Sequence, residues 1–200
     1  FSSANKVSVA WSTQPLDRLR TLALALGAGK SDRYYAITAD VLREGQEAPM
    51  EDRGFRLERV VSNLTAEKRL GTEQAPFQMG DELLLTYRFE AKKAHHYVAL
   101  TDELPAGIEA VNFDLPQVAS VYRLPDEVKP TLFLDHSEVR DQSANLYFNQ
   151  VPVGHHTYAI LARVTGAGSF TWPSTQIHPM YQPYFGGLTA GRVAHSQHGP

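Results

Sequence analysis

The stretch "GDELLLTYRFEA", residues 80–91, decides the fold class of this chain. After a glycine–aspartate turn signal, Leu83, Leu85, Tyr87 and Phe89 occupy every second position. Successive side chains of a strand point to opposite faces, so these four apolar residues share one face and the residues between them share the other. The pattern predicts a strand that is buried on one face.

Five further segments repeat this alternation, and turn residues separate them. They are "GFRLERVV" (54–61), "HYVALTDEL" (96–104), "TLFLDHSEV" (131–139), "NLYFNQV" (145–151) and "HTYAILARVT" (156–165). Short strands separated by turn signals about every ten residues are typical of antiparallel sandwiches. We therefore predict an all-β chain that folds as an antiparallel sandwich.

Three segments do not fit this pattern clearly. Residues 14–26, "QPLDRLRTLALAL", suit either an amphipathic helix or a strand, and their strand-like neighbours favour a strand. The charged stretch 43–53, "REGQEAPMEDR", has no periodicity and is the best candidate for a linker. Residues 115–130 are expected to form a loop or a short helix.

Composition excludes several classes of function. The chain has 200 residues, 42% of them hydrophobic and 20% charged, which is enough for a folded core. The net charge is -3 and no basic run is present, so nucleic acid is not an expected partner. The longest apolar run, "LALALGAG", is shorter than the roughly 20 residues of a membrane span, so no membrane contact is expected. Because the chain begins at Phe1 without a leader, we expect it to be part of a longer protein.

No recognisable motif for a catalytic, cofactor or metal site is present. The absence of cysteine excludes disulfides, thiolate metal ligands and cysteine nucleophiles. His95–His96 and His155–His156 are adjacent pairs, whose members point to opposite faces of a strand and cannot bind one metal together. We expect them to be exposed polar residues near strand starts. The "NLT" sequence at 63–65 matches a glycosylation acceptor, a pattern that is frequent by chance.

Carboxylates occur at two places where a glycosidase-like site could be imagined. Asp102 stands beside Glu103, and Asp135 begins a charged run that ends at Asp141. An enzyme would need two of these groups to converge on one cleft, which the sequence does not indicate. We expect the run from Asp135 to Asp141 to be a charged strand end, with Arg140 paired to a neighbour across the sheet.

One segment is too apolar for an ordinary surface loop. In "HPMYQPYFGGLTAGR", residues 178–192, prolines exclude a regular helix, yet Met180, Tyr181, Tyr184 and Phe185 are large and apolar. Two interpretations remain open from these residues alone. The segment either forms a contact surface for another domain or caps the open end of its own sandwich.

Several of the quoted strings, in this order and spacing, resemble the C-terminal end of bacterial alpha-2-macroglobulins. They include "GFRLERV", "GDELLLTYRFEA", "VALTDELPAGIEAVN" (98–112), "HTYAILARVTGAGSFTWP" (156–173) and "MYQPYFGGLTAGR" (180–192), and the resemblance extends from about Tyr34. Members of that family are large exported protease traps with fibronectin-like sandwich domains and a bait region. In many members a helical domain carries a thioester within C-x-E-Q.

The resemblance implies two domains and a non-catalytic role. Residues 1–50 would be the returning half of a CUB-like β domain, and residues 51–200 would be the last macroglobulin-like sandwich, of the fibronectin or immunoglobulin type. The implied partners are the thioester-type helical domain, other macroglobulin domains of the same chain, target proteases and other envelope proteins. The implied location is the bacterial periplasm or cell envelope.

The resemblance also assigns a role to the apolar segment. Met180 and Tyr181 correspond to a Met-Tyr pair that shields the thioester from water, and Tyr184 and Phe185 would extend this contact surface. The chain departs from the family where Gln182 and Tyr184 replace usual acidic residues, and "RDQ" at 140–142 replaces R-D-D. The alternative hypothesis is an adhesion or carbohydrate-binding module in which the aromatic rings of this loop stack on sugars.

Overall fold

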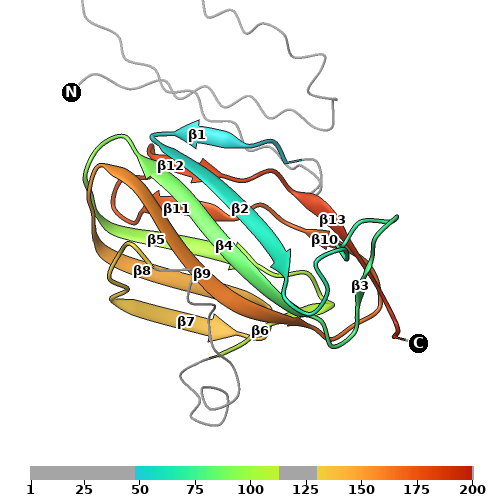
Figure 1. Cartoon of the computed structure of the whole chain (residues 1–200). Helices are drawn as coiled ribbons and strands as arrows, with labels where there is room; N and C mark the ends of the chain where they lie inside the picture. Colours follow the sequence, from blue (N-terminus) through green and yellow to red (C-terminus); the bar gives the residue numbers. More distant parts are fainter. Residues whose placement is uncertain (1–47, 113–129, 200) are drawn as a thin grey trace, which may run out of the picture. The chain divides into compact units, whose positions relative to one another are not determined.

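The computed structural model describes residues 48–112 and 130–199, all of which form strands and connecting loops (Figure 1). These residues contain no helix, and so no helix that could span a membrane. The all-β prediction is confirmed. The expectations for residues 14–26 and 115–129, and for the linker up to residue 47, lie outside the described residues. The domain boundary after residue 50 stays a prediction.

Within the described residues, thirteen strands form three sheets. They are β1 (Glu51–Arg53), β2 (Phe55–Asn63), β3 (Phe77–Gln78), β4 (Glu82–Ala91), β5 (His95–Glu103), β6 (Ile108–Ala110), β7 (His136–Arg140), β8 (Ser143–Val151), β9 (Gly154–Val164), β10 (Gly168–Trp172), β11 (Gln176–Pro179), β12 (Gly186–Leu188) and β13 (Arg192–Gln197). The sheet orders are β1-β12-β11-β5-β8-β7, β2-β4-β9-β6 and β10-β13-β3. Every described pairing is antiparallel except that of β13 with β3.

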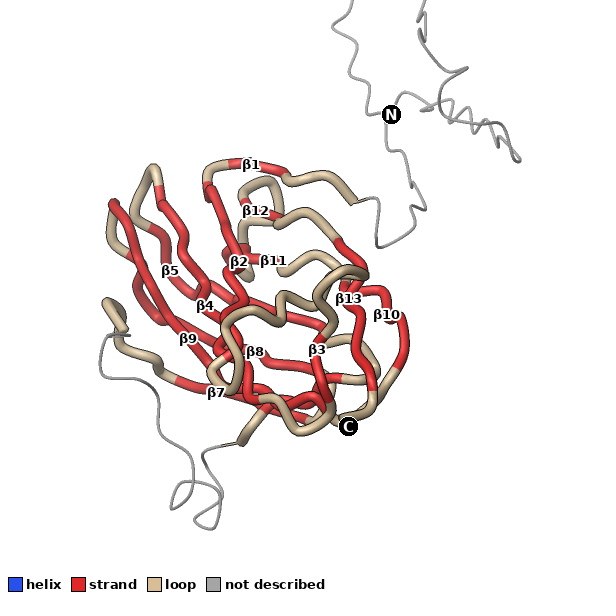
Figure 2. The backbone as a smooth tube through the Cα atoms, turned by 45° about the vertical axis from the view of Figure 1, so that its right-hand side comes forward, coloured by secondary structure: helices blue, strands red, loops and turns tan. Residues whose placement is uncertain are grey.

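The two larger sheets pack face to face and enclose the main core (Figure 2). From β4, Leu83, Leu85, Tyr87 and Phe89 all point into this core, as their alternation predicted. The opposite face of β4 was expected to be open, but Leu84 is buried. It packs in a second cluster with Ala159, Leu161 and Val111. Sequence parity thus identified the inner face of β4 but not the cover over its outer face.

Four other predicted strands correspond to β2, β5, β8 and β9. The fifth prediction was wrong in its first half, because β7 begins at His136 instead of Thr131. The backbone N–H of Thr131 bonds to Thr157 on β9, whereas that of Asp135 bonds to Tyr147 on β8. The segment therefore crosses from one sheet to the other and cannot follow either ladder. The linker prediction was also wrong at residues 51–53, which pair with β12 as β1.

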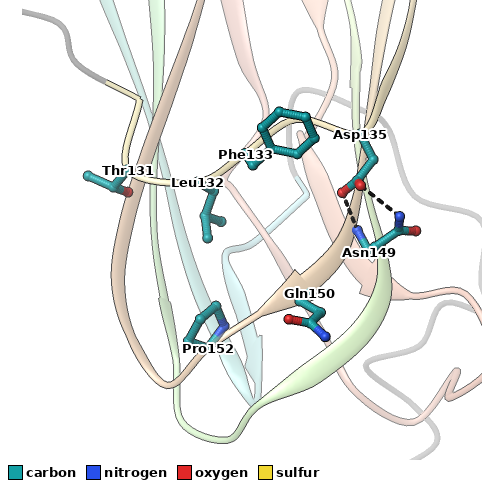
Figure 3. A pocket seen from close by; sticks show the side chains of 7 residues that line it. All are labelled: Thr131, Leu132, Phe133, Asp135, Asn149, Gln150 and Pro152. Atoms are coloured by element: carbon teal, nitrogen blue, oxygen red, sulfur yellow. Dashed lines mark hydrogen bonds between the residues drawn. The ribbon is translucent and has the colours of Figure 1, made fainter.

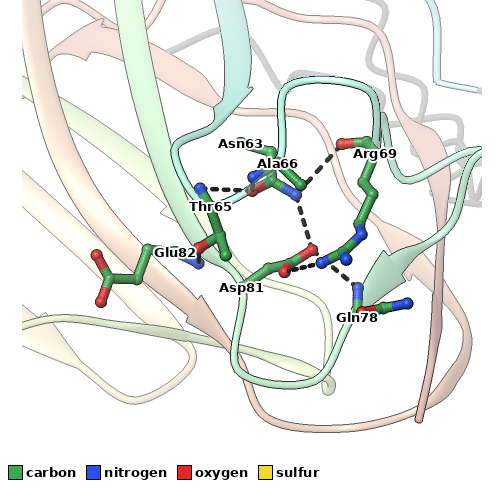
Figure 4. Close-up of polar contacts among 7 residues, drawn as sticks. All are labelled: Asn63, Thr65, Ala66, Arg69, Gln78, Asp81 and Glu82. Atoms are coloured by element: carbon green, nitrogen blue, oxygen red, sulfur yellow. Dashed lines mark hydrogen bonds and ion pairs between the residues drawn. The ribbon is translucent and has the colours of Figure 1, made fainter. Parts of the chain in front are cut away.

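A polar cluster fixes the loop between β2 and β4 (Figure 4). The Asn63 Nδ2 group donates to Asp81 at 2.7 Å, and its Oδ1 accepts the backbone N–H groups of Thr65 and Ala66, each at 2.9 Å. Asp81 also accepts a hydrogen bond from Arg69 at 2.6 Å. Asn63 is buried, and both ends of its amide are engaged, so the "NLT" match at 63–65 is a structural turn.

Candidate functional site

The apolar segment forms the hairpin that connects β11 to β12. Its six loop residues, 180–185, follow Pro179 at the end of β11. The Met180 N–H donates to the Tyr97 carbonyl at 2.8 Å and thereby extends the β11–β5 ladder by one step. Gln182 N–H donates to Pro179 at 3.2 Å, and Phe185 N–H donates to the Gln182 carbonyl at 3.1 Å. These bonds hold an irregular backbone in one defined shape.

Three of the four predicted contact residues project into solvent. Met180 is 50% exposed, Tyr181 is 76% exposed and Tyr184 is 86% exposed. The hairpin therefore does not cap the sandwich core with these side chains. Large exposed apolar groups on a fixed backbone are characteristic of an interaction surface. We call Met180, Tyr181 and Tyr184 the hairpin surface.

Phe185 differs from these three residues because it is partly buried against the domain. Its ring lies 5.2 Å from that of His95, which in turn lies 4.7 Å from Phe55. A Cβ atom at Gly54 would lie only 3.0 Å from the Phe185 ring, and Gly54 has a φ of 105° that disfavours other residues. Phe185 thus fixes the hairpin to the domain by packing on His95 and on Gly54, a position where only glycine fits.

The glycine pair after Phe185 permits a second close approach. A Cβ atom at Gly187 would lie 2.3 Å from the carbonyl oxygen of Phe55, closer than any side chain tolerates. Because β12 crosses β2 at this point, only glycine fits. The sequence signal for this packing was the "GG" pair at 186–187, although the pair alone did not identify its partner.

His95 lies beneath the hairpin and contacts two of its residues, Phe185 and Gln182. Burial lowers the pKa of His95, a hydrogen bond with the Gln182 side chain opposes this shift, and the charge of Lys93 adds to the lowering. The His95 Nε2 atom is buried without a hydrogen-bond partner. A proton on this ring would therefore add a charge in an apolar setting between Phe55 and Phe185.

The two histidine pairs obey strand parity but not the expected exposure. His96 and His155 are exposed as predicted, whereas His95 and His156 are buried. His156 contacts the Phe89 ring at 5.4 Å, and its Nε2 lies 2.8 Å from the Pro152 carbonyl oxygen. The prediction was wrong for the inner member of each pair because these rings fill aromatic niches of the core. No cluster of three or more histidines and carboxylates occurs in the described part of the chain.

Asp102 is fully buried and is the centre of a polar network inside the sandwich. Its carboxylate accepts hydrogen bonds from Arg59 at 2.5 Å, Thr175 at 2.9 Å and the Tyr87 hydroxyl at 2.9 Å. Burial, and next the Asp102 charge, raise the pKa of Tyr87. We call Arg59, Tyr87, Asp102 and Thr175 the Asp102 network. Its burial leaves Asp102 no access to a substrate.

Two guanidinium groups lie against the Trp172 ring next to this network. The Arg59 and Arg192 guanidinium carbons lie 4.4 Å and 4.5 Å from the centre of the Trp172 ring. Burial, reinforced by the charge of Arg59, lowers the pKa of Arg192 to about 10. Arg59 is far from Trp172 and Arg192 in the sequence, and no local sequence pattern predicts that they pack together.

Asp135 lies elsewhere, at an open hollow of about 290 Å³ (Figure 3). Both of its carboxylate oxygens accept hydrogen bonds from Asn149, each at 2.6 Å. Arg140 pairs with Glu138, two residues earlier on the same strand, so the expected partner across the sheet was wrong. Asp102 and Asp135 therefore do not form the converging carboxylate pair that a glycosidase site needs.

Comparison with known proteins gives one consistent answer. The family model of the bacterial alpha-2-macroglobulin MG10 domain matches residues 54–183. No curated protein matches the chain by sequence. Among solved structures, Escherichia coli alpha-2-macroglobulin activated by porcine elastase matches with a TM-score of 0.62 and 21% identity, over 75% of this chain and 14% of that one.

Two further structures agree with this match. Salmonella alpha-2-macroglobulin reacted with methylamine has a TM-score of 0.62 and 18% identity, over 76% of this chain and 10% of that one. Native Escherichia coli alpha-2-macroglobulin from domain MG7 to the C-terminus has a TM-score of 0.61 and 19% identity, over 76% of this chain and 25% of that one. At these identities the likeness establishes the fold. This chain spans only a small part of each of these proteins.

Proposed function

Since the chain belongs to the bacterial alpha-2-macroglobulin family, whose MG10 domain matches residues 54–183, we propose that it is the non-catalytic C-terminal docking portion of a protease trap. Its partner is the thioester-type helical domain of the same full-length protein. The docked domain holds the trap in its native state and is released after a protease cuts the bait. The trap acts in the bacterial periplasm or cell envelope, where it inhibits a broad range of proteases.

The observation that carries this proposal is the hairpin surface. Met180 and Tyr181 expose 50% and 76% of their surface while the backbone between β11 and β12 is hydrogen-bonded in one shape. A thioether chain adapts to an irregular partner surface, and a tyrosine ring adds a rigid apolar plate. Full burial of two such side chains contributes about 1.5–3 kcal/mol each. This burial energy is enough to keep Met180 and Tyr181 closed, as a lid, over the thioester and away from water.

The roles within the hairpin follow from its geometry. Phe185 packs on His95, and the exposed Gln182 reaches the same ring with its side chain, whereas Met180, Tyr181 and Tyr184 face outward. Gln182 replaces an acidic residue of the family pattern, and its contact with His95 gives this replacement a structural use. A neutral amide lets His95 stay uncharged in its buried position.

The test uses the full-length trap with Met180→Ala and Tyr181→Ala combined. We expect methylamine to react at least about tenfold faster, because losing even the roughly 1.5 kcal/mol of one of these side chains opens the site about ten times more often. Complex formation with elastase or trypsin should fall in parallel. Phe133→Ala is the matched control, since Phe133 is 82% exposed but lies outside the hairpin. Unchanged methylamine reactivity and unchanged trapping in the double variant would exclude the lid role.

The carbohydrate-binding alternative makes a different prediction for the same residues. Sugar stacking would use the open rings of Tyr181 and Tyr184, while Phe185 is committed to His95 and Gly54. Glycan-array binding by this chain that is lost in Tyr184→Ala would favour that alternative over docking.

A further inference from the structure

Tyr97 has a backbone conformation that tyrosine rarely adopts. Its φ is 54°, and no other non-glycine residue in the described part of the chain has a positive φ. The left-handed region brings Cβ close to the carbonyl oxygen, so bulky residues are genuine outliers there. Such strain persists only where the surrounding structure maintains it, and it concentrates at functional sites.

The position of Tyr97 links it directly to the hairpin surface. Its carbonyl oxygen accepts the Met180 N–H at 2.8 Å. Its ring meets that of Tyr181 edge-on, with centroids 5.7 Å apart and planes at 85°. This is the favoured arrangement for an aromatic pair. Tyr97 is itself 53% exposed, so it stands beside Tyr181 in solvent instead of filling the core.

We propose that Tyr97 is a positioning residue of the docking site, which holds Tyr181 ready for its partner and joins the same contact surface. This inference rests on the proposed function, and the occupant is again the thioester-type helical domain of the full-length chain. The strained φ aims the Tyr97 ring at Tyr181, while the Tyr97 carbonyl fixes the start of the hairpin through Met180. Tyr97 thus fixes both the backbone at Met180 and the orientation of the Tyr181 ring.

Strain and function can be separated at this position because glycine suits the backbone but has no ring. In the full-length protein, Tyr97→Gly should unfold at the same temperature or a higher one, since a positive φ costs glycine little. Methylamine should nevertheless react roughly three- to tenfold faster, the range that an aromatic pair contributes. Tyr97→Phe keeps the ring and should react at the wild-type rate. Tyr97→Asn is a second ringless variant that tolerates this φ and should behave like Tyr97→Gly.

A second readout separates positioning from docking. A fluorotyrosine placed at Tyr181 reports the neighbouring ring through its ¹⁹F chemical shift. The shift should move in Tyr97→Gly and stay in Tyr97→Phe. If it stays in Tyr97→Gly as well, Tyr97 does not position Tyr181 and the inference is overturned.

The failure of each proposal has its own signature. A fast methylamine reaction in the Met180→Ala and Tyr181→Ala variant, with a wild-type rate in Tyr97→Gly, overturns the role of Tyr97 but not the lid. Wild-type rates in both variants overturn the lid role and with it the docking role of Tyr97.

Discussion

The β5–β11 pair ends in two opposite ways. At one end Asp102 and Thr175 meet inside the sandwich, where Asp102 is 0% exposed. At the other end Tyr97 and Met180 meet in solvent, where they are 53% and 50% exposed. A charge is therefore buried at one end of this strand pair and large apolar side chains are exposed at the other, which reverses the usual distribution at both ends.

The difference lies in where each end finds its partners. Asp102 has Arg59, Tyr87 and Thr175 within hydrogen-bonding distance, so its partners belong to the same domain. The hairpin surface has no comparable cover in the described part of the chain. A buried charge with partners holds a fold together, whereas an exposed apolar group with a fixed backbone invites association. We therefore assign stability to the first end and propose docking for the second.

The strongest test of this contrast is Asp102→Ala. It leaves the Arg59 side chain, which is 3% exposed, without its counter-charge. Removing one partner of a buried ion pair costs about 3–5 kcal/mol. We expect the free energy of unfolding, measured by urea denaturation of this chain, to fall by that amount.

A surface pair provides the matched control for Asp102→Ala. Glu138 pairs with Arg140 on β7, where the two side chains are 41% and 73% exposed. Glu138→Ala should cost about 1 kcal/mol or less. Replacing Arg59 by Met together with Asp102 by Leu should restore part of the lost stability, because Arg59 is then no longer left as a buried charge without its partner. Equal costs for Asp102→Ala and Glu138→Ala would contradict the structural role of the network.

Two adjacent aromatic residues sharpen the contrast within the hairpin. Phe185→Ala removes a partly buried ring from Gly54 and His95 and should cost about 1–2 kcal/mol. Tyr184→Ala removes an 86% exposed ring and should change the free energy of unfolding by about 0.5 kcal/mol or less. Both values come from the same denaturation experiment. A larger loss in Tyr184→Ala than in Phe185→Ala would reverse the assignment of anchor and contact residue.

Sequence reasoning predicted what strand parity controls. Alternation identified β4 and its inner face, and it separated His95 from His96. It also favoured a strand over residues 131–139, and Leu132 and Leu134, which share one parity there, both pack on the core. It failed to predict that the segment containing them crosses between sheets. Side-chain parity is preserved in such a crossing, but the choice of hydrogen-bond partners is not encoded locally.

The site was predictable only in part for a related reason. Large apolar residues between prolines made a contact surface at Met180 and Tyr181 one of two open interpretations, and the exposure of both side chains is consistent with it. Tyr97 lies in an ordinary strand pattern, and neither its φ nor its contact with Tyr181 has a local signal. The Asp102 network likewise joins residues that only the folded sheets bring together. Local sequence patterns predict which face of a strand a side chain occupies and where turns lie, whereas contacts between distant residues are seen only in the structure.

The smallest expected effect concerns pH and the support of the hairpin. Because burial lowers the pKa of His95 from 6.5, the unfolded chain binds a proton more readily than the folded one. The stability that this neutral ring contributes is fully present above pH 6.5. It declines as the pH falls below 6.5 and is lost once the pH passes the lowered folded pKa. Urea denaturation of this chain at a series of pH values measures the decline.

Three variants assign this pH dependence to His95 and its position under the hairpin. His95→Gln should remove the part of the decline that this ring causes, whereas His96→Gln, which changes the exposed neighbour, should preserve it. Gln182→Glu should make the decline smaller, since a carboxylate beside His95 favours the charged ring and raises its pKa. A decline that is the same in His95→Gln as in the wild-type chain would show that other groups cause it. A decline that grows in Gln182→Glu would place Gln182 away from His95 in solution. Because Gln182 belongs to the hairpin and His95 to β5, the pH profile directly reports how firmly the docking loop rests on the sandwich.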